Sequence, residues 1–233
     1  MEKFRENAER GNPYAQYFLG VSYSVGKGVE QSDVEAVKWY RKSAEQGNAK
    51  AQYTLGIAYI FGKGVKEDKA EGMKWICKSA EQGDADAQFH MGVAYDDGNC
   101  VKQDYAVAVK WYRKSAEQGN AKAQLRLGIA YALGLGVLKK NSIEALKWYS
   151  KSAEQGNADA QYFLGVACAN GNGVVKNVKT AYGWLLLASA GGNKDSSEML
   201  ASLEKSLSPS EQRETQAWAK QWKPKHSPLL TQP

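Results

Sequence analysis

The middle of the chain carries three side chains that could bind a metal ion. Asp86, His90 and Asp97 are separated by four and seven residues, a spacing that places them along one face of a helix. Residues 96–99, DDGN, look like part of a calcium loop, but such a loop needs a bidentate Glu at its twelfth position, which here is Val107. No second histidine lies nearby, as a transition-metal site would require. We therefore predict no metal site and interpret these side chains as an acidic patch.

Nucleophilic chemistry is the other possibility. Cys77, Cys100 and Cys168 lack the paired spacings of a disulfide scaffold or a zinc site, so we expect reduced thiols. Cys77 aligns with Arg41 of the first block and is expected to be exposed, whereas Cys168 replaces a core Tyr and is expected to be buried. Catalysis by a thiol needs a nearby base. The two histidines, His90 and His226, are expected on a helix face and in the C-terminal tail, away from the thiols. We predict no catalytic residue, no cofactor and no enzyme activity.

An internal repeat positions these residues. A block of 36 residues recurs five times, and the fourth block has one extra residue within 137–141. A Gly-x-Gly segment such as Gly26-Lys27-Gly28 occurs in four blocks, but it follows a helix rather than a strand, so we interpret it as a turn and not as a phosphate loop. In the third block Cys100 replaces the second glycine. Each block follows an AEQG or AERG segment, whose glycines are Gly11, Gly47, Gly83, Gly119 and Gly156.

Each block predicts two short helices, here called helix A and helix B. Helix A begins after an N-cap residue whose side chain accepts from the first-turn amides, namely Asn12, Asn48, Asp84, Asn120 or Asn157. It ends at a glycine, namely Gly26, Gly62, Gly98, Gly134 or Gly171. Helix B begins after Ser32, Asp68, Asp104, Asn141 or Asn177, and three blocks add a Glu that predicts a capping box, namely Glu35, Glu71 and Glu144. Helix B carries one recurring tryptophan, which is Trp39, Trp75, Trp111, Trp148 or Trp184.

The pattern A-x-[AS]-Q-[YF]-x-L-G-x-x-Y-x-x-G-x-G-V, followed by K-W-Y-x-K-[SA]-A-E-Q-G, resembles the Sel-1-like repeat, a relative of the tetratricopeptide repeat. The resemblance covers about residues 8–192. It implies an all-α fold, a right-handed α/α superhelix (solenoid) of antiparallel helix pairs, and a protein-binding adaptor of bacterial type. Cysteine-rich relatives pair a Cys near the end of helix B with one in the next helix A. Those positions are Ala44 and Gln52 here, so this disulfide is not expected.

We expect one continuous domain with four parts. These are a partial N-terminal helix (residues 1–10), five repeats of 36–37 residues (11–192), C-terminal capping helices (193–222) and a flexible tail (223–233). Caps are expected because an uncovered terminal repeat leaves apolar surface in water. Ser208, Pro209 and Glu211 predict the start of the last helix, which carries Trp218 and Trp222 one turn apart.

Three positions of helix A change identity between repeats, whereas Ala15, Leu19, Gly20 and Tyr23 and their equivalents recur as core, with Gly20 expected to allow a close approach of helices A and B. The three positions lie within roughly 40° of one another on the helix and form one stripe, here called the helix A stripe. In solenoids of this type the first helix of each pair lines the concave face, so we predict that the stripe binds a peptide or protein segment. Its residues are Tyr14, Phe18, Val25, Lys50, Thr54, Phe61, Asp86, His90, Asp97, Lys122, Arg126, Leu133, Asp159, Phe163 and Asn170.

Charge and hydropathy exclude other partners. The chain has 31 Lys+Arg against 25 Asp+Glu, but its lysines recur in pairs on helix B, such as Lys38 and Lys42, near Glu45. We therefore expect a solvated outer face and no nucleic-acid partner. No apolar run approaches the roughly 20 residues of a spanning helix, which predicts no membrane insertion. As written, the sequence begins without a signal peptide, which predicts a cytoplasmic location, or a periplasmic or secreted one if the N-terminus has been trimmed.

The preferred interpretation is thus a non-enzymatic adaptor, and the sequence predicts no oligomeric state. Two alternatives come from the resemblance. Some family members are immunity-type proteins that neutralise a secreted bacterial toxin, and cysteine-rich relatives have been linked to β-lactam binding and hydrolysis. The second alternative is the weaker, because this chain has neither their cysteine pairs nor a nucleophile with a base.

Overall fold

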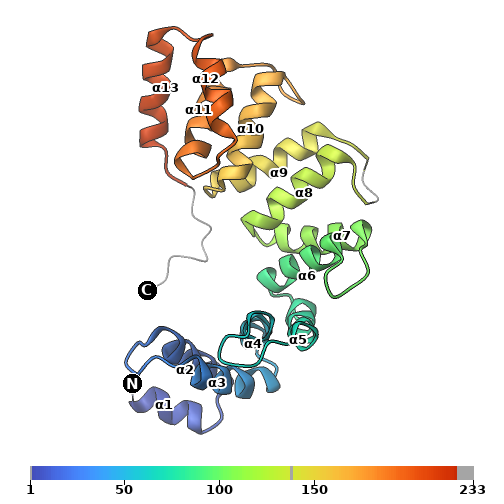
Figure 1. Ribbon diagram of the computed structural model, residues 1–233, viewed down its shortest axis with the longest axis vertical. Helices are drawn as coiled ribbons and strands as arrows, with labels where there is room; N and C mark the ends of the chain where they lie inside the picture. The colour runs from blue at the N-terminus through green and yellow to red at the C-terminus, as the bar shows by residue number, and fades with distance from the viewer. Residues whose placement is uncertain (1, 137–138, 225–233) are drawn as a thin grey trace. The chain divides into compact units, whose positions relative to one another are not determined.

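The computed structural model describes residues 2–136 and 139–224, and all regular secondary structure in these ranges is helical. Residues 137 and 138 of the extra-residue loop, and the tail from residue 225 on, including His226, lie outside the described residues. The helices follow one another as Figure 1 shows. Their bounds are α1 (Glu2–Glu9), α2 (Pro13–Val25), α3 (Asp33–Glu45), α4 (Ala49–Phe61), α5 (Lys69–Glu81), α6 (Ala85–Asp97), α7 (Tyr105–Glu117), α8 (Ala121–Leu133), α9 (Ser142–Glu154), α10 (Ala158–Asn170), α11 (Val178–Ala190), α12 (Ser196–Glu204) and α13 (Pro209–Gln221).

The chain divides into two compact units, residues 1–111 and 112–233. In the first unit α2 packs on α3 and α4 on α5, and α1 packs on α2. In the second unit α8 packs on α9 and α10 on α11, and α11 also contacts α12 and α13. These helix pairs are the α/α solenoid that the sequence predicts. Within the described ranges, no helix combines the length and the apolar character needed to cross a bilayer.

Both ends of helix A form as the sequence predicts. The Asn12 side chain accepts from the amide of Ala15 at 3.0 Å, and the four equivalent caps make the same bond at 2.9–3.0 Å. At the other end Gly26 has φ 72°, and its four equivalents are also left-handed. A left-handed residue at this place ends the helix and favours glycine. The equal lengths of α2, α4, α6, α8 and α10 follow from these fixed stops.

The capping box predicted at the start of helix B is only half formed. The Ser32 side chain accepts from the Glu35 amide at 3.3 Å, which is the first half of the box. The Ser32 amide, however, donates to the carbonyl of Tyr23 at 2.9 Å, and the other two repeats concerned make the same bond. Because helix A already supplies this acceptor, the Glu35 carboxylate accepts from Lys38 Nζ at 2.6 Å instead. The prediction was therefore wrong for these three repeats.

Glycines inside helix A permit a close approach of helix B. A Cβ on Gly20 would lie 2.6 Å from the ring of Tyr40, and one on Gly56 would lie 2.8 Å from the carbonyl oxygen of Gly72. Non-bonded carbon atoms prefer about 3.5–4.0 Å. These glycines are therefore required by packing, which confirms the sequence interpretation of Gly20.

Polar side chains join neighbouring helices, both within each helix pair and between one pair and the next. Ser43 Oγ donates to the Pro13 carbonyl at 2.6 Å, and Gln46 Nε2 donates to Gln16 Oε1 at 2.7 Å. Gln16 Nε2 in turn donates to the Ala8 carbonyl at 3.1 Å. Equivalent bonds recur in later repeats. The Ser and Gln of the repeat thus satisfy buried carbonyls between neighbouring helices.

Two helices cover the end of α11. Figure 1 shows α12 and α13 beside it, and α13 begins with a complete capping box between Ser208 and Glu211, as predicted. The ring of Trp184 on α11 meets Trp218 and Trp222 on α13 edge to face, with centroids 5.8 and 6.3 Å apart. Edge-to-face pairs of this kind stabilise aromatic contacts beyond the area that they bury.

Candidate functional site

The helix A stripe lies on α2, α4 and α6 in the first unit and on α8 and α10 in the second. Thr54, His90 and Phe163 are half-buried, and the other twelve stripe residues are exposed. Each exposed side chain stands on a helix that is capped at both ends and packed on its partner helix. The stripe is therefore carried by rigid elements rather than by loops.

The N-terminal part of the stripe is aromatic. The ring of Phe18 lies 5.4 Å from that of Tyr17 and 6.2 Å from that of Phe4, measured between centroids. Phe4 belongs to α1 and Tyr17 to α2, and neither was predicted to take part. Tyr14 and Phe18 remain 68% and 52% exposed despite these contacts. This end of the first unit thus presents an aromatic surface that is larger than the sequence prediction.

The middle of the stripe is acidic and carries the one histidine of the described residues. The His90 ring lies 5.5 Å from the rings of both Tyr53 and Phe89. Among the residues that the structure describes, no group of three His, Cys, Asp or Glu side chains could hold a metal ion. Burial and, to a smaller extent, the nearby carboxylates of Asp86 and Asp84 together raise the pKa of Tyr53 to about 12. The His90 ring therefore packs against two aromatic rings in the part of the stripe that carries the carboxylates of Asp86 and Asp97.

Hollows recur between neighbouring repeats, next to the stripe. Each is bounded by the end of one helix A, the start of helix B and the next helix A. The hollow among α4, α5 and α6 measures about 400 Å³ and is lined by Phe61, Met73 and His90 among others. The equivalent hollow among α8, α9 and α10 measures about 350 Å³ and includes Leu133 and Phe163. The one among α2, α3 and α4 measures about 180 Å³. The repeat geometry thus places a partly apolar recess beside stripe residues, which sequence periodicity did not predict.

The second unit brings opposite charges together on the stripe. Arg126 and Asp159 line a hollow of about 290 Å³ with Tyr162 and Phe163. The Phe163 ring stacks on Tyr149 of α9, with centroids 5.1 Å apart and planes 13° apart. Burial raises the pKa of Tyr149 to about 12. Phe163 is therefore anchored on helix B, while the charged side chains remain in contact with water.

The thiols do not form a reactive site. Cys77 was predicted to be exposed, but it is half-buried, and its thiol donates to Glu81 Oε1 at 3.5 Å. Burial raises the pKa of Cys77, and the Glu81 carboxylate raises it further, which disfavours the nucleophilic thiolate. Cys168 is buried, as predicted. Cys100 has φ 65°, a left-handed backbone that glycine adopts in the other repeats and that is strained for cysteine.

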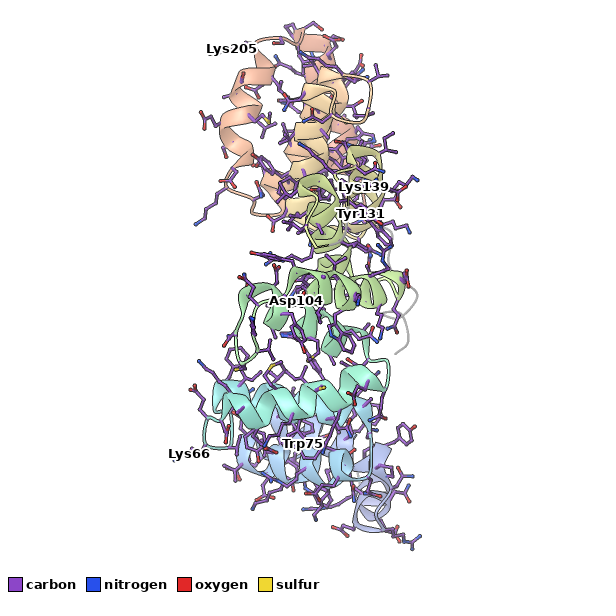
Figure 2. All side chains as sticks on the ribbon, turned by 90° about the vertical axis from the view of Figure 1, so that its right-hand side faces the viewer. Lys66, Trp75, Asp104, Tyr131, Lys139 and Lys205 are labelled. Carbon is purple, nitrogen blue, oxygen red and sulfur yellow. The ribbon has the colours of Figure 1, made fainter. Side chains whose placement is uncertain are left out.

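The outer face of helix B is partnered within its own helix. In three repeats its first lysine pairs with the Glu three residues before it, as Lys38 does with Glu35 at 2.6 Å. Its second lysine lies over the recurring tryptophan, and Lys78 Nζ is 4.3 Å from the ring centroid of Trp75, which Figure 2 labels on α5. The glutamate expected near these lysines was Glu45 and its equivalents, whereas the described ion pairs use the first-turn glutamates.

A family model matches each repeat of the chain. The model described as Sel1 repeat covers residues 13–48, 49–84, 85–120, 121–157 and 158–193. Sel1 repeat proteins are generally scaffolds for protein interactions and are typically not enzymes. The comparison with curated proteins found no match.

Solved structures give the same assignment. The chain is similar to a Sel1 repeat protein from Oxalobacter formigenes, with 35% identity and a TM-score of 0.77 over 91% of this chain and 89% of that one. It is also similar to a protective antigen of uropathogenic Escherichia coli with an SLR fold, with 35% identity and a TM-score of 0.79 over 93% of this chain. The match covers 46% of the antigen, so the chain spans about half of its length. An immunity protein from Pseudomonas aeruginosa, with 22% identity and a TM-score of 0.52 over 89% of this chain and 78% of that one, shares the fold alone.

Proposed function

Because the chain belongs to the Sel1 repeat family, we propose that it is a non-enzymatic scaffold that binds a segment of another protein along the helix A stripe. One observation carries the proposal, which is the exposure of large apolar side chains at the last stripe position of successive helices in the first unit. Val25 of α2 is 62% exposed and Phe61 of α4 is 71% exposed, and Phe18, at another stripe position of α2, is 52% exposed. In the second unit Leu133 of α8 occupies the position that corresponds to Phe61 and is 65% exposed. Exposed apolar groups that gather on one face mark interaction surfaces, whereas singly scattered ones do not.

The hollows support an apolar anchor for the bound segment. Phe61 lines both the hollow among α2, α3 and α4 and the one among α4, α5 and α6. A side chain inserted beside it would also meet Ile57 or Met73. Such enclosed apolar contacts contribute most of the binding energy in protein interfaces.

The charges of the stripe favour a polypeptide that carries both signs. In the first unit Lys50 faces the same stripe as Asp86 and Asp97, and in the second unit Arg126 shares a hollow with Asp159. A nucleic acid would meet these carboxylates with its phosphates, which is unfavourable. A protein segment with alternating charges and one or more apolar side chains satisfies both features.

The proposal is tested by affinity purification from a lysate of the source organism with a triple variant, Phe18→Ala, Phe61→Ala and Arg126→Ala. Since these side chains are exposed, the variant is expected to fold normally, as checked by circular dichroism and thermal unfolding. A partner bound by the unmodified protein should be lost from the variant.

A matched control alters the outer face of helix B instead. The triple variant Lys38→Ala, Lys74→Ala and Lys147→Ala changes the same number of exposed side chains and should retain the partner. Equal capture by all three proteins would show that the altered stripe residues are not needed for binding, and loss in the control alone would place the binding surface on helix B. Either result would contradict the proposal.

A further inference from the structure

A hollow of about 610 Å³ lies between α11 and α13, away from the helix A stripe. Figure 1 shows these two helices side by side at the end of the second unit. The volume is within the range of about 300–1,000 Å³ that is typical of ligand pockets. Its lining consists of Lys179, Thr180, Gly183 and Trp184 from α11 and Glu214, Thr215 and Trp218 from α13.

The hollow coincides with departures of the fifth repeat from the pattern of the others. Thr180 stands where earlier helices B have Glu35, and Gly183 stands where they have Lys38. In three of the four earlier repeats these two positions form an ion pair on the helix surface. Their replacement by small side chains removes that pair, and at Gly183 it lets Trp218 of α13 pack closely on α11, because a Cβ there would lie 3.0 Å from the Trp218 ring. The hollow lies beside this contact.

Tryptophan rings form the apolar walls. Trp184 and Trp218 both line the hollow, with centroids 5.8 Å apart, and Trp218 is 43% exposed. In three other repeats the equivalent tryptophan has a lysine ammonium 4.2–4.3 Å from its ring centroid, as Lys42 has over Trp39. The fifth repeat has Leu187 at that lysine position. This tryptophan position thus accepts cations elsewhere in the chain, and in the fifth repeat helix B does not supply one there.

One ammonium group and two carboxylates lie at or near the hollow. Lys179 and Glu214 line it, and Glu211 lies close enough to act on both of them through its charge. Lys179 Nζ lies 2.6 Å from Glu214 Oε2, which neutralises that pair. A hydrogen bond from Lys179 lowers the pKa of Glu214. Hydrogen bonds from Ser208, and then the charge of Lys179, lower the pKa of Glu211. Both carboxylates are therefore ionised at neutral pH beside one ammonium group.

We propose that this hollow binds an arginine side chain of a partner protein. A planar guanidinium can stack on the exposed ring of Trp218 and turn its N–H groups toward the carboxylate of Glu214. The aliphatic part of the side chain then packs against Trp184 and Thr215. The hollow is a second interaction site on the helix B side of the chain, and it does not depend on the helix A stripe.

The test uses N-acetyl-L-argininamide as the probe and the indole N–H signals of the seven tryptophans in ¹H–¹⁵N spectra as the readout. The probe should shift the signals of Trp184 and Trp218 with saturation in the millimolar range, which is reasonable for a single side chain. N-acetyl-L-glutaminamide, which has no charge, should cause no saturating shift. Equal shifts with both probes, or none with arginine, would overturn the proposal.

Variants separate the site from the fold. Glu214→Gln should weaken binding of the arginine probe by at least about fivefold, because it removes one carboxylate. Trp218→Leu should abolish the saturating shift, whereas Trp222→Leu, which alters the neighbouring ring contact of Trp184 outside the hollow, should leave it unchanged. If Trp218→Leu loses the fold of the cap, the Glu214→Gln result decides. Unchanged affinity in Glu214→Gln would overturn the inference.

The helix A variants give an independent control. The triple variant at Phe18, Phe61 and Arg126 should bind the arginine probe as the unmodified protein does. A failure of partner capture at the stripe therefore leaves this inference standing, and a failure of the probe titration leaves the stripe proposal standing.

Discussion

The exposed faces of helix A and helix B differ in how their side chains are partnered. On helix B the same pairs recur, such as Lys38 with Glu35 and Lys42 with the ring of Trp39. On helix A the stripe changes identity from repeat to repeat and leaves apolar groups such as Phe61 exposed. The lysines of helix B are thus held by contacts within one helix, whereas large apolar side chains of the stripe such as Phe61 are left exposed.

The difference shows that exposure alone does not identify a binding surface in a repeat protein. Ion pairs and cation–π contacts on a helix surface each contribute only a few tenths of a kcal/mol to about 1 kcal/mol, and they keep the face hydrated. The exposed aromatics of the stripe contribute little to folding, because burial of their area is what would stabilise the chain. Their exposure agrees with the proposal that the stripe contacts another protein.

The largest expected effect comes from breaking the core that both faces share. Leu55 is fully buried in the first unit, and Leu55→Ala should lower the free energy of unfolding by about 3 kcal/mol through lost contacts and a cavity. Urea unfolding followed by circular dichroism measures this change. A loss below about 1 kcal/mol would mean that the two faces do not depend on a common core.

The pH dependence of stability tests the contact between helix A and helix B, because the ring of Tyr149 on helix B stacks on the stripe residue Phe163. Burial raises the pKa of Tyr149 from 10.0 to about 12. Since the unfolded tyrosine ionises first, the stability contribution of this group is complete below pH 10 and is lost as the pH rises to about 12. The slope is at most about 1.4 kcal/mol per pH unit for one such group.

Urea unfolding at pH 9 to 11 tests this dependence. Tyr149→Phe should show a smaller fall in the free energy of unfolding over that interval than the unmodified protein. Parallel curves for the two proteins would show that the Tyr149 hydroxyl is not protected by the helix pair.

The start of helix B offers a smaller contrast between two neighbouring carboxylates. Asp68 accepts from the amide of Glu71 at 2.9 Å, so Asp68→Ala should cost about 1 kcal/mol. Glu71 pairs with Lys74 on the surface, so Glu71→Ala should cost less than about 0.5 kcal/mol and lose that effect in high salt. If thermal unfolding showed equal losses of stability for the two variants, Glu71 would have to cap the helix as well, which would contradict the half-formed box seen in the structure.

The smallest stability effect is expected on the stripe itself. Phe61→Ala should change the free energy of unfolding by less than about 0.5 kcal/mol, because the ring is 71% exposed. The same variant should weaken capture of the partner in the affinity experiment. A large loss of stability would assign Phe61 to the core and remove the main contrast between the two faces.

Much of the fold could be predicted from the sequence because its decisive interactions are local. The cap bond from Asn12 to Ala15 spans three residues, and the left-handed glycine Gly26 acts on the backbone of its own turn. The close approach at Gly20 was also predictable, because only a residue without a side chain recurs in the middle of an otherwise bulky helix. The stripe followed from comparing the five copies, although its use as a binding surface stays a prediction.

Features that depend on neighbouring helices could not be predicted in this way. The capping boxes failed because the carbonyl of Tyr23, on the preceding helix, already accepts the Ser32 amide. Cys77 was placed on the surface by its alignment with Arg41, but packing leaves it half-buried. The hollow beside Trp184 depends on which residue of α13 faces Gly183, and that helix does not follow the repeat.

The sequence by itself determined the helices, their caps, their repeat and the family, because each of these rests on contacts within about one block of chain. The tertiary structure decided which exposed residues have partners. It showed that the helix B lysines are held by Glu35 or Trp39 and their equivalents, that hollows open beside the stripe, and that a further hollow lies between α11 and α13. These properties depend on distances between helices, which the order of residues along one helix does not contain.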